Sequence, residues 1–84
     1  MSPADDAEAV GAIARAIHRY VIAHPDAADT VEGIHRWWLL PTLHEESIMR
    51  VEEAVEQLVS EGVLRSISPE DGRVIYCYAQ QRRL

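Results

Sequence analysis

The residues with the greatest capacity for chemistry in this chain are four histidines, one cysteine and fourteen carboxylates. Metal sites need ligands at short, regular spacings, such as two histidines four residues apart on one helix. Neither the histidines nor Cys77 show such a spacing, and no serine lies in a nucleophile motif. We therefore expect no metal site, no cofactor and no enzymatic activity. The histidines are His18, His24, His35 and His44.

Charge is distributed unevenly along the sequence. Residues 43–63 contain six acids and one arginine, whereas residues 64–84 contain two acids and four arginines. The acids of the first stretch, Glu53 and Glu56 among them, alternate with apolar residues and should cover the solvent side of a helix. Simple solvation is the commoner role of such a face, and contact with a basic partner is the alternative.

Two adjacent tryptophans form the most informative local feature. Successive helical residues point about 100° apart, so Trp37 and Trp38 should not share one direction of burial. Trp38 is in phase with Val31 and Ile34 and is expected in the core. Trp37 is either a second cover of the small core or part of a partly exposed apolar patch, which would be typical of a protein interface. The expected neighbours of Trp37 in this patch are Leu39, Leu40 and Leu43.

Three helices must position these residues, at about 5–23, 30–39 and 43–61. Asp5-x-x-Glu8 and Thr42-x-x-Glu45 resemble capping boxes, Asp29 or Thr30 can cap the second helix, and Gly62 can end the third. Pro25 should stop the first helix at His24. Apolar residues recur at helical spacing and mark the buried faces. They are Val10, Ile13, Ile17, Tyr20, Val21, Val31, Ile34, Trp38, Ile48, Val51, Val55, Leu58 and Val59.

Two strands are expected after the third helix, at about 63–67 and 73–79. The intervening residues 68–72 contain a proline and a glycine at positions that favour a turn, and residues 80–84 form a tail. The prediction is one α+β domain over residues 1–84, with three helices followed by a two-stranded antiparallel hairpin.

This order of elements resembles the winged helix-turn-helix superfamily, and so do residues 29–79 in detail. Ser47, Val51 and Leu58 follow the spacing of the third helix of that superfamily, and Gly62-Val63-Leu64-Arg65 resembles the entry into its wing. The turn Pro69-Glu70-Asp71-Gly72-Arg73 looks like the wing turn of bacterial regulators of the multiple-antibiotic-resistance type. The segment 40–46 departs from the pattern, because it is longer than the usual turn.

The resemblance implies DNA binding, with the third helix in the major groove and the wing on the backbone. Candidate contacts are Ser47, Arg50, Arg65 and Arg73. The glutamates of the third helix argue against this function, because they would meet a polyanion at close range. The arginines have a second interpretation, which is pairing with the acids of this protein.

We therefore place protein interaction first and DNA-binding transcriptional regulation second. The interaction hypothesis uses an acidic third-helix face with a Trp/Leu corner, and its partner is a protein with a basic surface or a second copy of this chain. Its residues are Trp37, Leu40, Leu43, Glu53 and Glu56. No apolar stretch approaches the roughly 20 residues of a membrane span, and the first residues do not resemble a signal peptide. We expect no membrane association and a cytoplasmic location.

Overall fold

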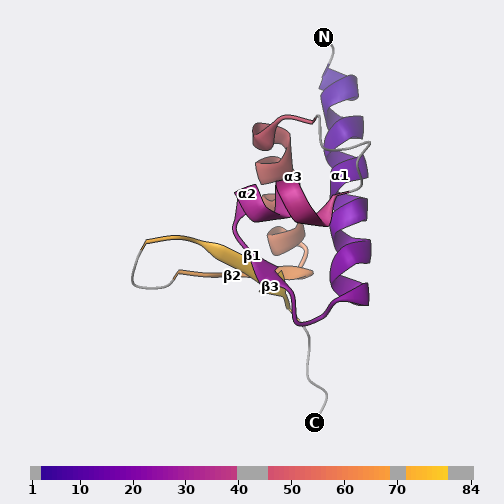
Figure 1. Ribbon diagram of the computed structural model, residues 1–84. Helices are drawn as coiled ribbons and strands as arrows, with labels where there is room; N and C mark the ends of the chain where they lie inside the picture. The colour runs from indigo at the N-terminus through magenta and orange to yellow at the C-terminus, as the bar shows by residue number, and fades with distance from the viewer. Residues whose placement is uncertain (1–2, 40–45, 69–71, 80–84) are drawn as a thin grey trace.

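The computed structural model describes residues 3–39, 46–68 and 72–79, and the side chains from residue 7 onward within these ranges (Figure 1). In this part of the chain, helices and a small antiparallel sheet are combined, which confirms the α+β class. The elements in chain order are α1 (Pro3–Ala23), β1 (Ala28–Asp29), α2 (Val31–Gly33), the π-helical turn η1 (Ile34–Trp38), α3 (Ile48–Ser60), β2 (Leu64–Ile67) and β3 (Ile75–Tyr78).

The end of the first helix agrees with the prediction, and its start does not. It stops at Ala23, before the His24-Pro25 pair, as expected. It begins at Pro3, two residues earlier than predicted, so Asp5 lies inside the helix and the predicted cap there is wrong. Proline suits a first helical position because it lacks only an N–H that has no helical partner in any case.

The second predicted helix is two short helical turns of different geometry. The hydroxyl of Thr30 caps α2 by accepting a hydrogen bond from the Gly33 N–H at 3.2 Å. The chain then continues directly into η1, where Ile34 and Trp38 are buried as predicted. The Trp38 ring stacks on Tyr20 of α1, with 4.8 Å between ring centroids and 14° between planes. This stack fixes the corner formed by α2 and η1 against the long first helix.

The third helix begins later than predicted. Its N-cap is Ser47, whose hydroxyl accepts a hydrogen bond from the Arg50 N–H at 3.2 Å. Glu46 and Ser47 are therefore outside the helix, and the predicted start at residue 43 is wrong. Ile48 becomes the first helical residue and is 40% exposed, so its predicted burial is wrong as well. The proposed capping box at 42–45 lies outside the described residues.

The end of α3 is the glycine stop that the sequence predicts. Gly62 has a φ of 83°, its N–H donates to the Val59 carbonyl at 3.1 Å, and the Val63 N–H donates to the Leu58 carbonyl at 2.9 Å. These two bonds are those of a Schellman motif, which satisfies the last carbonyls of the helix. The chain therefore leaves α3 and enters β2 with a single residue, Val63, between the glycine and the strand.

The sheet has three described strands in the order β1-β3-β2, all antiparallel. The predicted hairpin is present, with Leu64 paired to Tyr78 and Ile67 to Ile75, and Gly72 has the expected positive φ of 87°. The additional strand β1, which pairs Ala28 with Cys77, corrects the prediction of two strands. Two residues are too few to show an alternating pattern, so no strand is predicted there.

The hydrophobic core lies between α1, α3 and one face of the sheet. Of the predicted helix faces, all residues except Ile48 are buried or pack against the core. From the sheet, Leu64 of β2 is buried, and Tyr76 and Tyr78 of β3 pack on the core. Figure 1 shows the β2–β3 hairpin extending away from the helices. The core members with the least exposure are Ile13, Ile17, Val21, Ile34, Val51, Ala54 and Val55.

Candidate interaction surface

Trp37 is a large aromatic side chain that the protein leaves in solvent. It is 69% exposed, whereas its neighbour Trp38 is 6% exposed. The interpretation in which both rings cover the core is therefore wrong. Leu39, expected beside Trp37 in an exposed patch, is 4% exposed and belongs to the core, so this expectation is also wrong. Leu40 and Leu43 lie outside the described residues.

A side-chain hydrogen bond holds η1 next to the beginning of α3. Nε2 of His35 lies 2.9 Å from the carbonyl oxygen of Glu46. Because a carbonyl oxygen can only accept, this nitrogen carries the proton and donates. The bond joins residues eleven positions apart, and it sets the element that carries Trp37 against the helix that carries the glutamates. No spacing in the sequence indicates this role of His35.

The exposed side of α3 combines carboxylates with one apolar side chain. Glu52, Glu53 and Glu56 are all exposed, and Met49 is 71% exposed. Met49, Glu53 and Glu56 are spaced by four and three residues and therefore share one side of the helix. The opposite side contains Val51, Ala54, Val55 and Leu58 and is buried. We call the four exposed residues Met49, Glu52, Glu53 and Glu56 the acidic face.

Two of the predicted DNA contacts have local interactions at the start of α3. Nη1 of Arg50 donates to Oε1 of Glu46 at 2.9 Å, in an ion pair whose side chains are about a quarter exposed. The hydroxyl of Ser47 accepts from the backbone of Arg50 in the helix cap. The only basic residue of α3 therefore has an acidic partner within the same segment, which leaves the charge of the acidic face negative.

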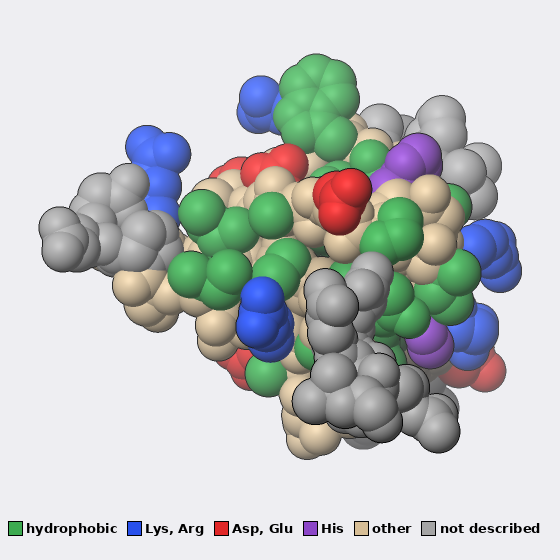
Figure 2. All heavy atoms as spheres, turned by 90° about the horizontal axis from the view of Figure 1, so that it is seen from below, with side chains coloured by type: hydrophobic (Ala, Val, Ile, Leu, Met, Phe, Trp, Pro, Cys, Tyr) green, Lys and Arg blue, Asp and Glu red, His purple; other side chains and the backbone are tan. Residues whose placement is uncertain are grey.

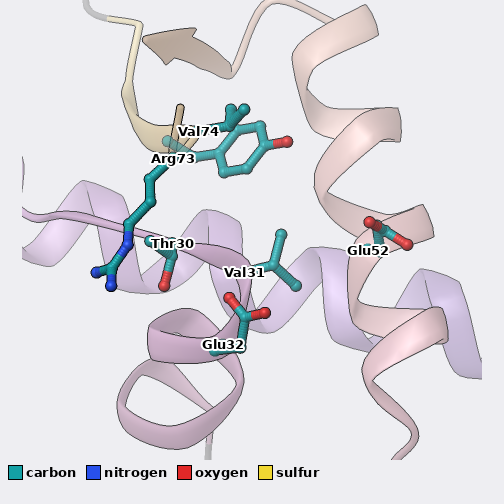
Figure 3. Close-up of a pocket in the computed structure, with 7 residues that line it drawn as sticks. Thr30, Val31, Glu32, Glu52, Arg73 and Val74 are labelled. Atoms are coloured by element: carbon teal, nitrogen blue, oxygen red, sulfur yellow. The ribbon is translucent and has the colours of Figure 1, made fainter. Parts of the chain in front are cut away.

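An open hollow of about 560 Å³ lies between α2, α3 and the hairpin (Figure 3). In Figure 3, Glu52 of α3 lies on one side of the hollow, and Arg73 extends past Thr30 on the other. Three elements far apart in the sequence supply the lining, so no single stretch of sequence could have indicated it. The lining residues are Thr30, Val31, Glu32, Glu52, Arg73, Val74 and Tyr76.

The pKa of Tyr76 reflects the electrostatic environment of this hollow. Burial raises the pKa of the Tyr76 phenol above its usual range, and the negative charges of Glu56 and Glu52 raise it further. Carboxylates act in this way because they disfavour the formation of a second anion near them. The field of the acidic face therefore extends to the hairpin side of α3.

The two predicted wing arginines are both exposed but point to different sides of the hairpin. Arg73 lines the hollow beside α2. Arg65 follows the buried Leu64 on β2 and therefore projects from the opposite face of the sheet. In the view of Figure 2, basic side chains are scattered among apolar and acidic ones. The geometry does not bring Ser47, Arg50, Arg65 and Arg73 together as one cluster.

Among the described residues, no three histidine, cysteine, aspartate or glutamate side chains are arranged to hold a metal ion. In the same part of the chain, no helix has the length and apolar character needed to cross a membrane. Comparison with known proteins gave no matching family model, no similar curated protein and no similar solved structure.

Proposed function

We propose that this chain is a non-enzymatic protein-interaction domain of the winged-helix type, which binds a partner protein through Trp37 and the acidic face. The observation that carries the proposal is the exposure of Trp37 at 69%, next to a tryptophan that the fold buries. Tryptophan is among the residues most enriched at the energetic centres of protein interfaces.

The chemistry of the acidic face indicates the kind of partner. Glu52, Glu53 and Glu56 favour a surface rich in lysine or arginine, because opposite potentials steer association and like charges are rejected. Trp37 and Met49 favour apolar depressions on that partner, since both expose large apolar surface. The partner surface is therefore basic with apolar pockets.

The winged-helix part of the proposal is supported by the arrangement of the elements. In the described residues, α1, the continuous pair α2 and η1, and α3 precede an antiparallel hairpin, and Gly62 leads from α3 towards β2. These features agree with the resemblance in the sequence. β1 pairs with β3 and extends the hairpin into a sheet without changing this order.

The proposal is tested with affinity capture followed by reconstitution. The wild-type protein, Trp37→Ala and Glu53→Arg/Glu56→Arg are used to capture proteins from an extract of the organism that encodes the chain. A captured protein is then identified, purified and titrated. We expect each variant to weaken its binding at least tenfold, and the exposed substitution Arg19→Ala on α1 to leave it unchanged. If no reconstituted complex depends on Trp37 or the two glutamates, the proposal is wrong.

DNA binding is the second candidate, and the hairpin favours it. The hairpin extends from the helical body (Figure 1), and Arg65 and Arg73 on it are exposed. The test is titration of a labelled mixed-sequence DNA duplex at low salt. Binding that weakens steeply with added salt, and weakens further in Arg65→Ala/Arg73→Ala, would favour a transcriptional regulator. We expect no such binding, because the acidic face lies on the helix that would enter the groove.

A further inference from the structure

The sheet has a second face, turned away from the core, that is also apolar. Residues paired across antiparallel strands share a face, and neighbours along a strand alternate between faces. Leu64, Tyr76 and Tyr78 mark the core side. The pairs of Arg65 with Cys77, Ile67 with Ile75 and Ala28 with Cys77 therefore place five residues on the other side. We call Ala28, Arg65, Ile67, Ile75 and Cys77 the outer sheet face.

This outer sheet face has the composition of a covered surface. Antiparallel sheets with one solvated side normally place polar residues there. Here four of the five residues are apolar, and Ile67 is 43% exposed. Within the described residues, Ile67, Ile75 and Cys77 do not pack on the hydrophobic core. Figure 2 shows apolar side chains gathered over the hairpin on the underside of the molecule.

The single charge on the outer sheet face indicates what covers it. Arg65 is exposed among apolar neighbours. A matching surface is apolar and carries carboxylates to pair with this arginine. The acidic face has that composition, because Met49 lies on the same side of α3 as Glu53 and Glu56. The acidic face cannot contact the outer sheet face of the same molecule, because α3 packs on the opposite, core side of the sheet.

We propose that the outer sheet face of one molecule binds the acidic face of a second copy of this chain. The inference rests on the proposed function, since it uses the acidic face as an interaction surface and adds a second copy of this chain as an occupant of that face. The dimensions agree: a helix of thirteen residues is about 20 Å long, and strands of four residues extend about 13 Å. Arg65 then pairs with Glu53 or Glu56, and Met49 lies against Ile67 and Ile75.

Charge also disfavours a dimer in which two outer sheet faces meet or two acidic faces meet. Two outer sheet faces would place one Arg65 near the other, and two acidic faces would bring six glutamates together. Like charges facing each other disfavour an interface. The contact is therefore between unlike surfaces, and each molecule has both of them. Two copies that contact each other reciprocally form a closed dimer, whereas a single contact continues into longer assemblies.

The experiment is a charge exchange between the two surfaces. Arg65→Glu and Glu53→Arg/Glu56→Arg are prepared with the reductant needed to keep Cys77 free, and molar mass is followed by light scattering and sedimentation over a wide concentration range. We expect wild-type mass to rise with concentration and each variant to associate at least tenfold more weakly. An equimolar mixture of the two variants should regain wild-type association, because its surfaces are again complementary. Arg36→Glu, the same change on η1, should behave as wild type.

A second measurement locates the contact. Cys77 is the only cysteine of the chain and lies on the outer sheet face. Its rate of alkylation should fall several-fold as wild-type concentration rises, and should stay constant in Arg65→Glu. Circular dichroism establishes that each variant is folded.

Three results would overturn the inference: a wild-type protein that is monomeric throughout, folded variants whose mixture stays monomeric, or association that leaves Cys77 equally reactive. The proposed function would survive any of them if partner binding still depends on Trp37, which belongs to neither of these two faces. Conversely, the inference of self-association would hold if Trp37→Ala associates as wild type does, even if no other partner protein binds through Trp37.

Discussion

The carboxylate of Asp29 occupies the position that a side chain at residue 33 would take, so Asp29 and Gly33 fit together only because residue 33 is glycine. Oδ1 of Asp29 accepts a hydrogen bond from the Thr30 N–H at 2.8 Å, and the Thr30 hydroxyl accepts one from the Gly33 N–H. These contacts join the end of β1 to the start of α2. They also orient Val31, which lines the hollow beside α3.

We predict that Gly33→Ala lowers the free energy of unfolding by about 1–3 kcal/mol, because the added methyl group displaces the Asp29 carboxylate from a packed corner. Urea unfolding followed by circular dichroism measures the change. Gly11→Ala on α1 is the matched control: its methyl group meets only the end of Arg15 at 3.5 Å, and it should stabilise by about 0.5–1 kcal/mol. In Asp29→Ala/Gly33→Ala, the cost should be smaller than the sum of the single changes. Strict additivity would contradict the close approach.

The two tryptophans should respond oppositely to the same substitution. Trp38→Ala removes a buried ring that stacks on Tyr20 and should cost about 3–5 kcal/mol. Trp37→Ala removes an exposed ring and should change stability by no more than about 0.5 kcal/mol. Thermal and urea unfolding of both variants provide the comparison. A large loss of stability in Trp37→Ala would mean that this ring serves the fold rather than a partner.

Gly62→Ala should destabilise the protein by about 1–2 kcal/mol, because a φ of 83° is unfavourable for any residue with a side-chain carbon. No atom lies within 4 Å of the added methyl group, so the cost is conformational rather than steric. Gly62→Asn should recover part of the loss, since asparagine tolerates this conformation better than alanine. Equal stability of the alanine and glycine proteins would show that the Schellman motif is not maintained in solution.

Tyr76 should make stability depend on pH in the alkaline range. Its pKa in the folded protein is raised by burial and by Glu56 and Glu52, so folding favours the protonated phenol. The stabilisation is fully present below the ordinary tyrosine pKa of about 10 and is lost as the pH rises through the higher folded value. Tyr76→Phe should therefore flatten the decline of the melting temperature above about pH 10.

A direct titration of Tyr76 separates the two causes. In Glu52→Gln/Glu56→Gln, the pKa of the phenol should move down towards its usual range without reaching it, because burial remains. Tyrosine labelled at Cζ gives one NMR signal for each of the three tyrosines, and the signal that is lost in Tyr76→Phe is that of Tyr76. An unchanged titration in that variant would mean that the field of α3 does not reach the hairpin.

Sequence reasoning predicted the elements whose signals are local and repeated. The apolar spacing of α1, the glycine at residue 62 and the turn glycine at residue 72 each specify a conformation by themselves. The predicted start of α3 was wrong because it rested on the Thr42-x-x-Glu45 box, whereas Ser47 is the N-cap, and the start of a helix also depends on tertiary contacts. One such contact is the bond of His35 to Glu46.

The remaining features depend on which segments meet in space. β1 is too short for a pattern, and the hollow between α2, α3 and the hairpin takes residues from segments more than forty positions apart. The apolar outer sheet face follows from strand register, which decides on which side each residue lies. Ile67 pairs with Ile75, and this register places both on the side of the sheet opposite Leu64.

The adjacent positions of Trp37 and Trp38 give the protein two intrinsic optical probes with separate environments. Trp38, stacked on Tyr20 in the core, reports unfolding, whereas Trp37 reports events at the surface. Quenching by a soluble collision agent should reach Trp37 and spare Trp38. With Trp38→Phe, the emission of one ring would show whether a binding event covers the corner next to α3, without any attached label.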